Sequence, residues 1–192
     1  MKTSLYNHNN FSWIVKSVLF FKNHYLIILA LGMAAALGRS AQLKAFGPIS
    51  QSLHLVLEIG IQSARILIFI YALGLTNVKI GALRAIQIAS SRRAWKQNWV
   101  IAREKMRRDW AQLLTNMIIY LLIAWVTNLL IDYAAYQTCL FAKLKSNEII
   151  SAQSSEWVII LFFKNLSVIP FTLIFNALFL LWITNRISEN RG

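Results

Sequence analysis

Five polar residues recur at steps of three or four within an otherwise apolar stretch of the chain: Gln51, His54, Glu58, Gln62 and Arg65. On an α-helix this spacing stacks them on one face, each within side-chain reach of the next. A charged residue at the centre of a transmembrane helix costs about 2.5–3.5 kcal/mol on insertion scales, so such residues normally face protein or water. We therefore expect this polar ladder to carry the function.

Two interpretations of the ladder compete. In the first, Glu58 and Arg65 are satisfied through His54, Gln62 and neighbouring amides, and the ladder only fixes helix packing. In the second, the ladder lines a wetted path that conducts ions or protons or opens as a gate. Glu58 is then the titrating group and Arg65 its electrostatic partner.

Two further apolar segments also carry polar residues that share one helical face, within about 40° of one another at about 100° per residue. These sets are Asn116, Tyr120 and Thr127, and Asn165, Thr172 and Asn176. We expect the three sets to form one polar intramembrane seam around a common interior. Pro170 predicts a kink in the last of these helices, because it removes a hydrogen bond to Leu166.

The sequence argues against an enzyme. The seven acidic residues are scattered, and no apolar segment holds two of them. No nucleophile, zinc-protease or phosphate-loop motif occurs. Three histidines in separate segments and the single Cys139 supply neither metal-ligand spacing nor an intramolecular disulfide. We expect no catalytic residue, metal, cofactor or small-molecule substrate.

These residues belong to a chain that has the composition of a membrane protein. Hydrophobic residues make up 57% of the 192, with a net charge of +13. Four mostly apolar segments are long enough to cross a bilayer, at about 25–43, 53–75, 113–133 and 166–183. They lack the alternation of barrel strands. The predicted fold is an all-α integral membrane bundle of four transmembrane helices, with residues 1–192 forming one domain.

The N-terminal region allows two interpretations. Residues 11–21 fit an in-plane amphipathic helix that precedes the first span. The rival is a signal peptide with an apolar core at 25–37, which the long, partly apolar leader disfavours. Within 25–43, small residues at four-residue spacing predict close helix packing, for which we favour contacts inside the chain over an oligomer face. The two pairs are Gly32 with Ala36 and Ala34 with Gly38.

The connection between the second and third spans is strongly basic. Only Glu104 and Asp109 oppose its nine cations, which are Lys79, Arg84, Arg92, Arg93, Lys96, Arg103, Lys105, Arg107 and Arg108. This asymmetry predicts that the connection and both termini are cytoplasmic, with residues 44–52 and 134–155 outside.

Residues 78–112 are predicted to form a cytoplasmic helical hairpin that extends spans two and three. An apolar stripe through Trp95, Trp99 and Met106 runs on into the third span, which predicts one continuous helix from about 94 to 131. Gly81 predicts a break or kink in the other arm. Residues 157–163 either lengthen the fourth span or lie in the membrane interface.

One face of the hairpin gathers Arg92, Lys96, Arg103 and Arg107 within about 60°. It is either a topology signal on a solvated surface or an anion-binding face for lipid headgroups or a nucleic-acid partner.

Together these features predict a non-enzymatic membrane protein whose polar seam forms a pore or permeability path. Its expected partners are the lipid bilayer and further copies of itself. The alternative is a membrane-anchored accessory or effector subunit. Its basic hairpin would recruit an anionic partner, either lipid headgroups or a nucleic-acid-bound protein.

Overall fold

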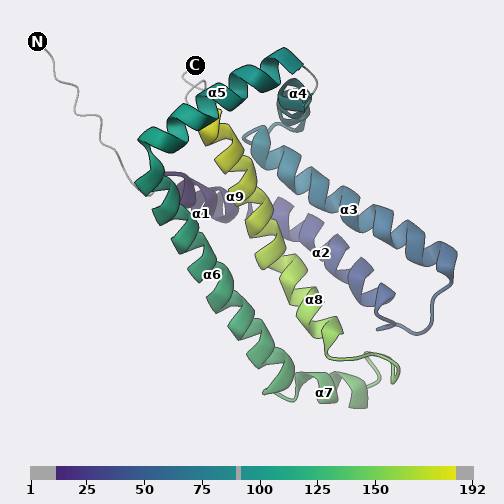
Figure 1. Cartoon of the computed structure of the whole chain (residues 1–192). Helices are drawn as coiled ribbons and strands as arrows, with labels where there is room; N and C mark the ends of the chain where they lie inside the picture. The colour runs from purple at the N-terminus through teal and green to yellow at the C-terminus, as the bar shows by residue number, and fades with distance from the viewer. Residues whose placement is uncertain (1–11, 90–91, 185–192) are drawn as a thin grey trace, which may run out of the picture.

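The computed structural model describes residues 12–89 and 92–184, and every regular element in this part of the chain is an α-helix (Figure 1). This confirms the predicted all-α class. The helices are α1 (Ser12–Asn23), α2 (Tyr25–Gln42), α3 (Gln51–Leu73), α4 (Val78–Ala89), α5 (Arg92–Arg108), α6 (Trp110–Tyr136), α7 (Leu140–Ser146), α8 (Trp157–Leu166) and α9 (Val168–Ile183).

Four helices are long and apolar enough to cross a membrane, as the sequence predicts: α2, α3, α6 and the joined pair α8–α9. The fourth runs for 27 residues from Trp157 to Ile183, so residues 157–163 belong to a long fourth helix. At 1.5 Å per residue its length is about 40 Å, which exceeds a hydrocarbon core of about 30 Å. The helix is interrupted at Ser167 (φ −124°, ψ −76°), three residues before Pro170.

The α8–α9 helix is the centre of the bundle, with α2 and α3 on one side and α6 on the other (Figure 1). Ile28, Ile68 and Leu178 join α2, α3 and α9 in one core cluster. In a second cluster, Trp13 of α1 packs against Phe175 and Trp182 of α9. The α1 helix is therefore anchored to α9 by its first turn, while its position relative to a membrane stays a prediction.

The prediction of one continuous helix from about 94 to 131 is wrong. The α5 helix ends at Arg108, α6 begins at Trp110, and Asp109 between them has φ −112° and ψ 28°. The α5 helix turns across the end of the bundle (Figure 1). There Ala102 and Met106 pack with Trp182. A straight helix would leave these apolar side chains in water, so burial favours the turn.

Gly81 does not break its helix, because α4 runs through it from Val78 to Ala89. A Cβ atom at Gly81 would collide with the carbonyl oxygen of Ile70 near the end of α3. The glycine therefore serves a close approach between α4 and α3, and the predicted break is wrong.

Candidate functional site

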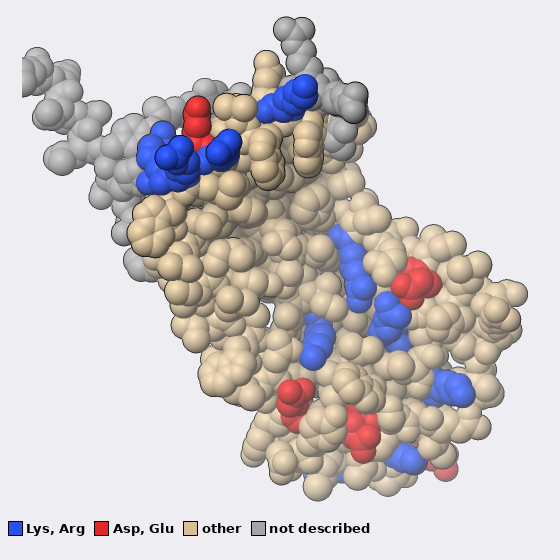
Figure 2. Space-filling view, in the orientation of Figure 1, with Lys and Arg blue, Asp and Glu red and all other residues tan. Residues whose placement is uncertain are grey.

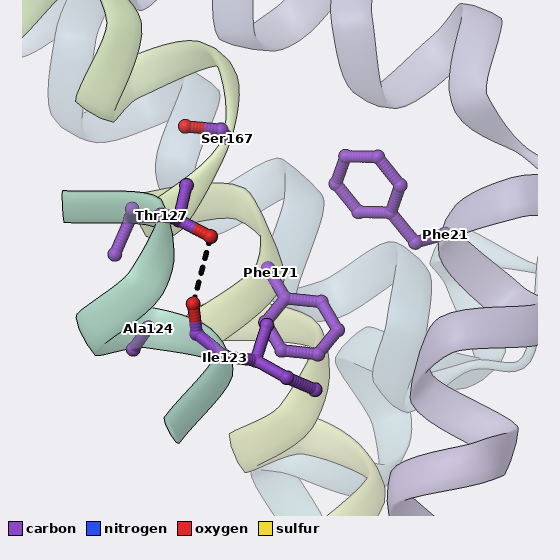
Figure 3. Close-up of a pocket in the computed structure, with 7 residues that line it drawn as sticks. Phe21, Ile123, Ala124, Thr127, Ser167 and Phe171 are labelled. Carbon is purple, nitrogen blue, oxygen red and sulfur yellow. Dashed lines mark hydrogen bonds between the residues drawn. The ribbon is translucent and has the colours of Figure 1, made fainter. Parts of the chain in front are cut away.

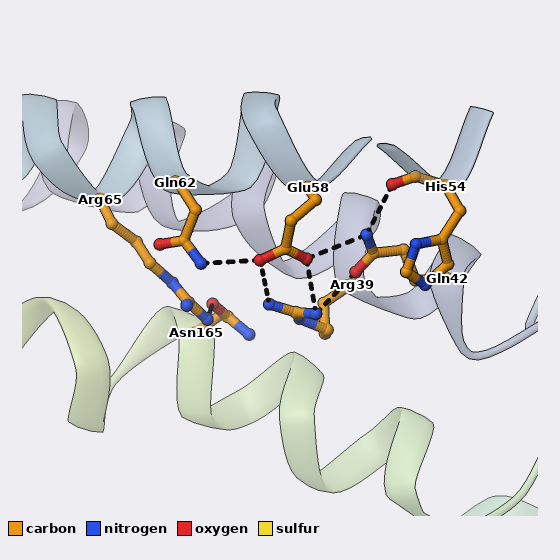
Figure 4. Close-up of polar contacts among 7 residues, drawn as sticks. All are labelled: Arg39, Gln42, His54, Glu58, Gln62, Arg65 and Asn165. Carbon is orange, nitrogen blue, oxygen red and sulfur yellow. Dashed lines mark hydrogen bonds and ion pairs between the residues drawn. The ribbon is translucent and has the colours of Figure 1, made fainter. Parts of the chain in front are cut away.

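Six polar side chains meet where α2, α3 and α8 adjoin, and we call them the polar cluster (Figure 4). They are Arg39, Gln42, Glu58, Gln62, Arg65 and Asn165. Three of the six belong to the predicted ladder on α3, and Asn165 to the predicted set on α8–α9. The two residues from α2 were not among the predicted site residues.

Glu58 is the acceptor at the centre of the polar cluster. Arg39 donates from Nη1 to Oε2 at 3.0 Å and from Nη2 to Oε1 at 3.4 Å. The amide nitrogens of Gln42 and Gln62 donate to the same carboxylate at 3.1 and 2.8 Å. The direct ion-pair partner of Glu58 is thus Arg39, whereas Arg65, the expected electrostatic partner, makes no ion pair with it. Helical periodicity could not predict this pair, because its two residues lie 19 positions apart on two different helices.

Arg65 has a different environment. Its Nη2 donates to Oδ1 of Asn165 at 2.8 Å, and the Asn165 amide is itself held by the Leu161 carbonyl at 2.7 Å. The Arg65 Nε is buried without a hydrogen-bond partner. Across residues 12–89 and 92–184, no carboxylate lies within ion-pair distance of Arg65. The polar cluster therefore carries two guanidinium groups and one carboxylate, a net charge of +1.

Two glycines of α2 set the geometry of the polar cluster. A Cβ atom at Gly32 would lie 2.9 Å from the backbone oxygen of Asn165, and one at Gly38 would lie 2.9 Å from Cγ1 of Ile61. The absence of these carbons brings α2 close to α8 and to α3. The favoured interpretation, that small residues of this helix pack within the chain, is confirmed at both glycines.

The outward side of the ladder is at the surface of the chain. Gln51, His54 and Gln62 are exposed, and the Glu58 side chain is 35% exposed. We call these four residues the α3 polar stripe. Gln51, His54 and Glu58 line an open hollow of about 380 Å³. Figure 2 shows Lys and Arg side chains scattered across the middle of one face of the bundle, with an acidic group beside them.

The other predicted seam residues do not join this site. On the opposite side of α8–α9, Tyr120 of α6 and Thr172 of α9 share a hydrogen bond of 2.8 Å. Asn116 is fully buried and accepts from the backbone nitrogen of Ile14 at 3.0 Å, so it holds α1 to α6. Because α8–α9 lies between α3 and α6, the three polar sets do not share the expected common interior.

The last two seam residues are also apart from the polar cluster. Thr127 borders a pocket of about 170 Å³ between α1, α6 and α8–α9 (Figure 3). Its hydroxyl donates to the Ile123 carbonyl at 2.7 Å, and that of Ser167 donates to the Phe163 carbonyl at 2.7 Å. The pocket is therefore lined almost entirely by apolar groups. Asn176 is exposed on α9.

The predicted basic face lies on α5. Lys96, Arg103 and Arg107 are exposed, and no ion pair engages them within the described residues, whereas the side chain of Arg92 lies outside the description. We call the three described residues the α5 basic surface. On the same helix, Trp95 and Trp99 are more than half exposed. Both also line an apolar hollow of about 170 Å³ against the end of α9.

Lys105 of α5 has a shifted pKa and contacts the end of α9. Its Nζ donates to the Trp182 carbonyl at 2.6 Å and lies 4.6 Å from the centre of the Trp182 ring. Burial lowers the pKa of Lys105 below its ordinary value of 10.5, and the nearby Asp109 carboxylate opposes this shift. Lys105 therefore ties α5 to the end of α9.

Over the described residues, no three His, Cys, Asp or Glu side chains come close enough to hold a metal ion. Comparison with protein-family models, curated proteins and solved structures finds no match to this chain. The polar cluster and the charges around it are therefore the features of the molecule that indicate a function.

Proposed function

We propose that this chain is a non-enzymatic, multi-pass membrane protein whose copies assemble around the α3 polar stripe and form a pore or permeability path. The observation that carries the proposal is the exposure of this stripe on a helix apolar enough to cross a membrane. A charge facing lipid at mid-membrane costs about 2.5–3.5 kcal/mol, so water or protein has to cover Glu58. A ring of copies of the chain supplies protein from its neighbouring subunits and water in its central path.

The length of the polar face supports a vestibule closed at one end. From Gln51 to Arg65 it spans 14 residue steps, or about 21 Å at 1.5 Å per residue. Beyond Arg65, the same side of α3 continues with the apolar residues Ile68, Phe69 and Ala72, which pack in the core shared with α2 and α9. The path thus has a polar part that the packed core of the bundle closes at one end.

The distribution of positive charge supports an orientation for this path. The basic helices α4 and α5 lie at the end of the bundle where α3 ends (Figure 1). The positive-inside rule places this end, and with it both termini, in the cytoplasm. The polar vestibule then opens to the outside, at the beginning of α3.

The test is leakage from vesicles that contain the purified, full-length protein. We expect a release of trapped ions that depends on the density of protein. His54→Leu combined with Gln62→Leu should reduce this release, because it makes the vestibule apolar. Leu122→Ala is the matched control, since Leu122 is exposed on α6, away from the polar cluster. Vesicles that stay tight around a folded, inserted protein would refute the proposal.

A second candidate is the accessory or effector subunit, which the free α5 basic surface favours. Basic residues near a membrane contribute about 1 kcal/mol each to binding of anionic headgroups, and phosphate contacts weaken with salt. Arg103→Glu with Arg107→Glu, in neutral nanodiscs, should weaken binding to added anionic vesicles or nucleic acid. Unchanged binding with unchanged salt dependence would eliminate this candidate.

A further inference from the structure

The charges of the polar cluster are unevenly compensated. Glu58 accepts four hydrogen bonds, two of them from Arg39, so this pair is neutral as a unit. Within the described residues, Arg65 donates its hydrogen bond to the neutral Asn165 amide and keeps a buried Nε without an acceptor. A guanidinium in a poorly solvated site favours an anion beside it, because burial of an uncompensated charge is unfavourable.

We infer that small inorganic anions of the chloride class bind beside Arg65, and that the permeability path selects anions over cations. This inference rests on the proposed pore and names what the pore carries. The anion takes the place of the missing counter-charge, and Arg65 presents N–H donors to it. Cations are repelled by the same charge.

Groups around Arg65 reinforce this preference. Lys164 precedes Asn165 on α8, is partly exposed, and has no ion-pair partner within the described residues. The helix dipole places partial positive charge at the beginning of α3, and α4, which follows the end of α3, carries Lys79 and Arg84. Glu58 is the one acidic residue of α3, and its charge is paired with that of Arg39.

The experiment measures the reversal potential of the full-length protein in a planar bilayer under a potassium chloride gradient. We expect a reversal potential between zero and the equilibrium potential of chloride. Arg65→Gln should shift the reversal potential toward the equilibrium potential of potassium. Arg65→Lys keeps the charge and should leave the sign of the reversal potential unchanged. Lys143→Gln, which removes an exposed cation on α7, is the matched control and should cause no shift.

The possible results separate the two claims. Absence of conductance would overturn both the pore and the anion site. Conductance with potassium preference would overturn the anion site and leave the pore standing. A chloride preference that Arg65→Gln does not alter would show that Arg65 does not determine the ion selectivity, and would contradict the inferred anion site. If Arg65→Gln fails to assemble, Glu58→Gln decides, because it frees Arg39 and should shift the potential further toward chloride. A shift toward potassium would contradict the inference.

Discussion

Removal of the Arg39 guanidinium should destabilise the bundle through Glu58. Arg39→Gln breaks two charge-assisted hydrogen bonds to Glu58, of 3.0 and 3.4 Å, and a third to Oε1 of Gln42 at 2.7 Å. Hydrogen bonds to charged groups contribute about 1.5–3 kcal/mol each. The Arg39 and Glu58 side chains are 21% and 35% exposed, and solvent screening weakens such a pair. We therefore expect Arg39→Gln to lower the free energy of unfolding by about 2–3 kcal/mol, below the sum of the three bonds.

A double-mutant cycle isolates the pair. Arg39→Gln and Glu58→Gln, singly and together, should give a coupling free energy of about 1–2 kcal/mol, within the range for residues of one network. The matched cycle of Arg65→Gln with Glu58→Gln should stay below about 0.5 kcal/mol. The assay is equilibrium unfolding in mixed detergent micelles, followed by fluorescence of the seven tryptophans. An Arg65–Glu58 coupling equal to the Arg39–Glu58 coupling would refute the assignment of partners.

Three further outcomes are expected. Gly32→Ala should cost about 1–3 kcal/mol in unfolding free energy, because its Cβ would lie 2.9 Å from the Asn165 oxygen; Gly60→Ala, with nothing within 4 Å, should instead stabilise by about 0.5–1 kcal/mol. Burial lowers the folded-state pKa of Lys105, so the unfolded chain binds more protons between that pKa and 10.5. Stability should rise with pH in this window, and Lys105→Met should flatten the rise. An impermeant thiol reagent should label native Cys139 in intact cells, whereas Gln97→Cys in a Cys139→Ser background should react only after lysis; the reverse pattern would contradict the orientation.

Much of the helical framework could be predicted from the sequence, because a bilayer-length apolar run leaves few alternatives to a helix. The stretch around Leu53 to Leu75 reappears as α3, and the polar ladder lies on it at the expected spacing. Two of its members, Glu58 and Gln62, are in direct contact, as the four-residue step predicts. Local periodicity was sufficient for these features.

Partners on other helices could not be predicted in the same way. Arg39 is close to the end of α2, and its contact with Glu58 depends on how α2 and α3 approach each other at Gly38. The separation of Tyr120 and Thr172 from the polar cluster depends on the central position of α8–α9. Helical periodicity places a residue on a face but does not say which helix that face meets.

The turn at Asp109 could not be predicted for the same reason, because it depends on contacts with another helix. An apolar stripe from Trp95 to Met106 that runs on into α6 is compatible with a straight helix and with a bent one. Burial of Ala102 against the end of α9 decides between them, and that contact joins residues far apart in the sequence. A buried aspartate whose carboxylate accepts from the Arg108 guanidinium at 3.1 Å occupies the turn. Asp is unfavourable inside helices and favoured near their beginnings, so it offered a weak local signal.

The most direct test of the central claim is whether water reaches the α3 polar stripe in the assembled protein. Gln62→Cys and Ser63→Cys, each in a Cys139→Ser background, place thiols at nearly the same depth on exposed positions about 100° apart around α3. We expect a small, charged thiol reagent to modify Gln62→Cys in protein-containing vesicles and to reduce ion release, with Ser63→Cys unreactive in the lipid. If Gln62→Cys is unreactive, or if Ser63→Cys reacts equally well, the stripe does not line an aqueous path.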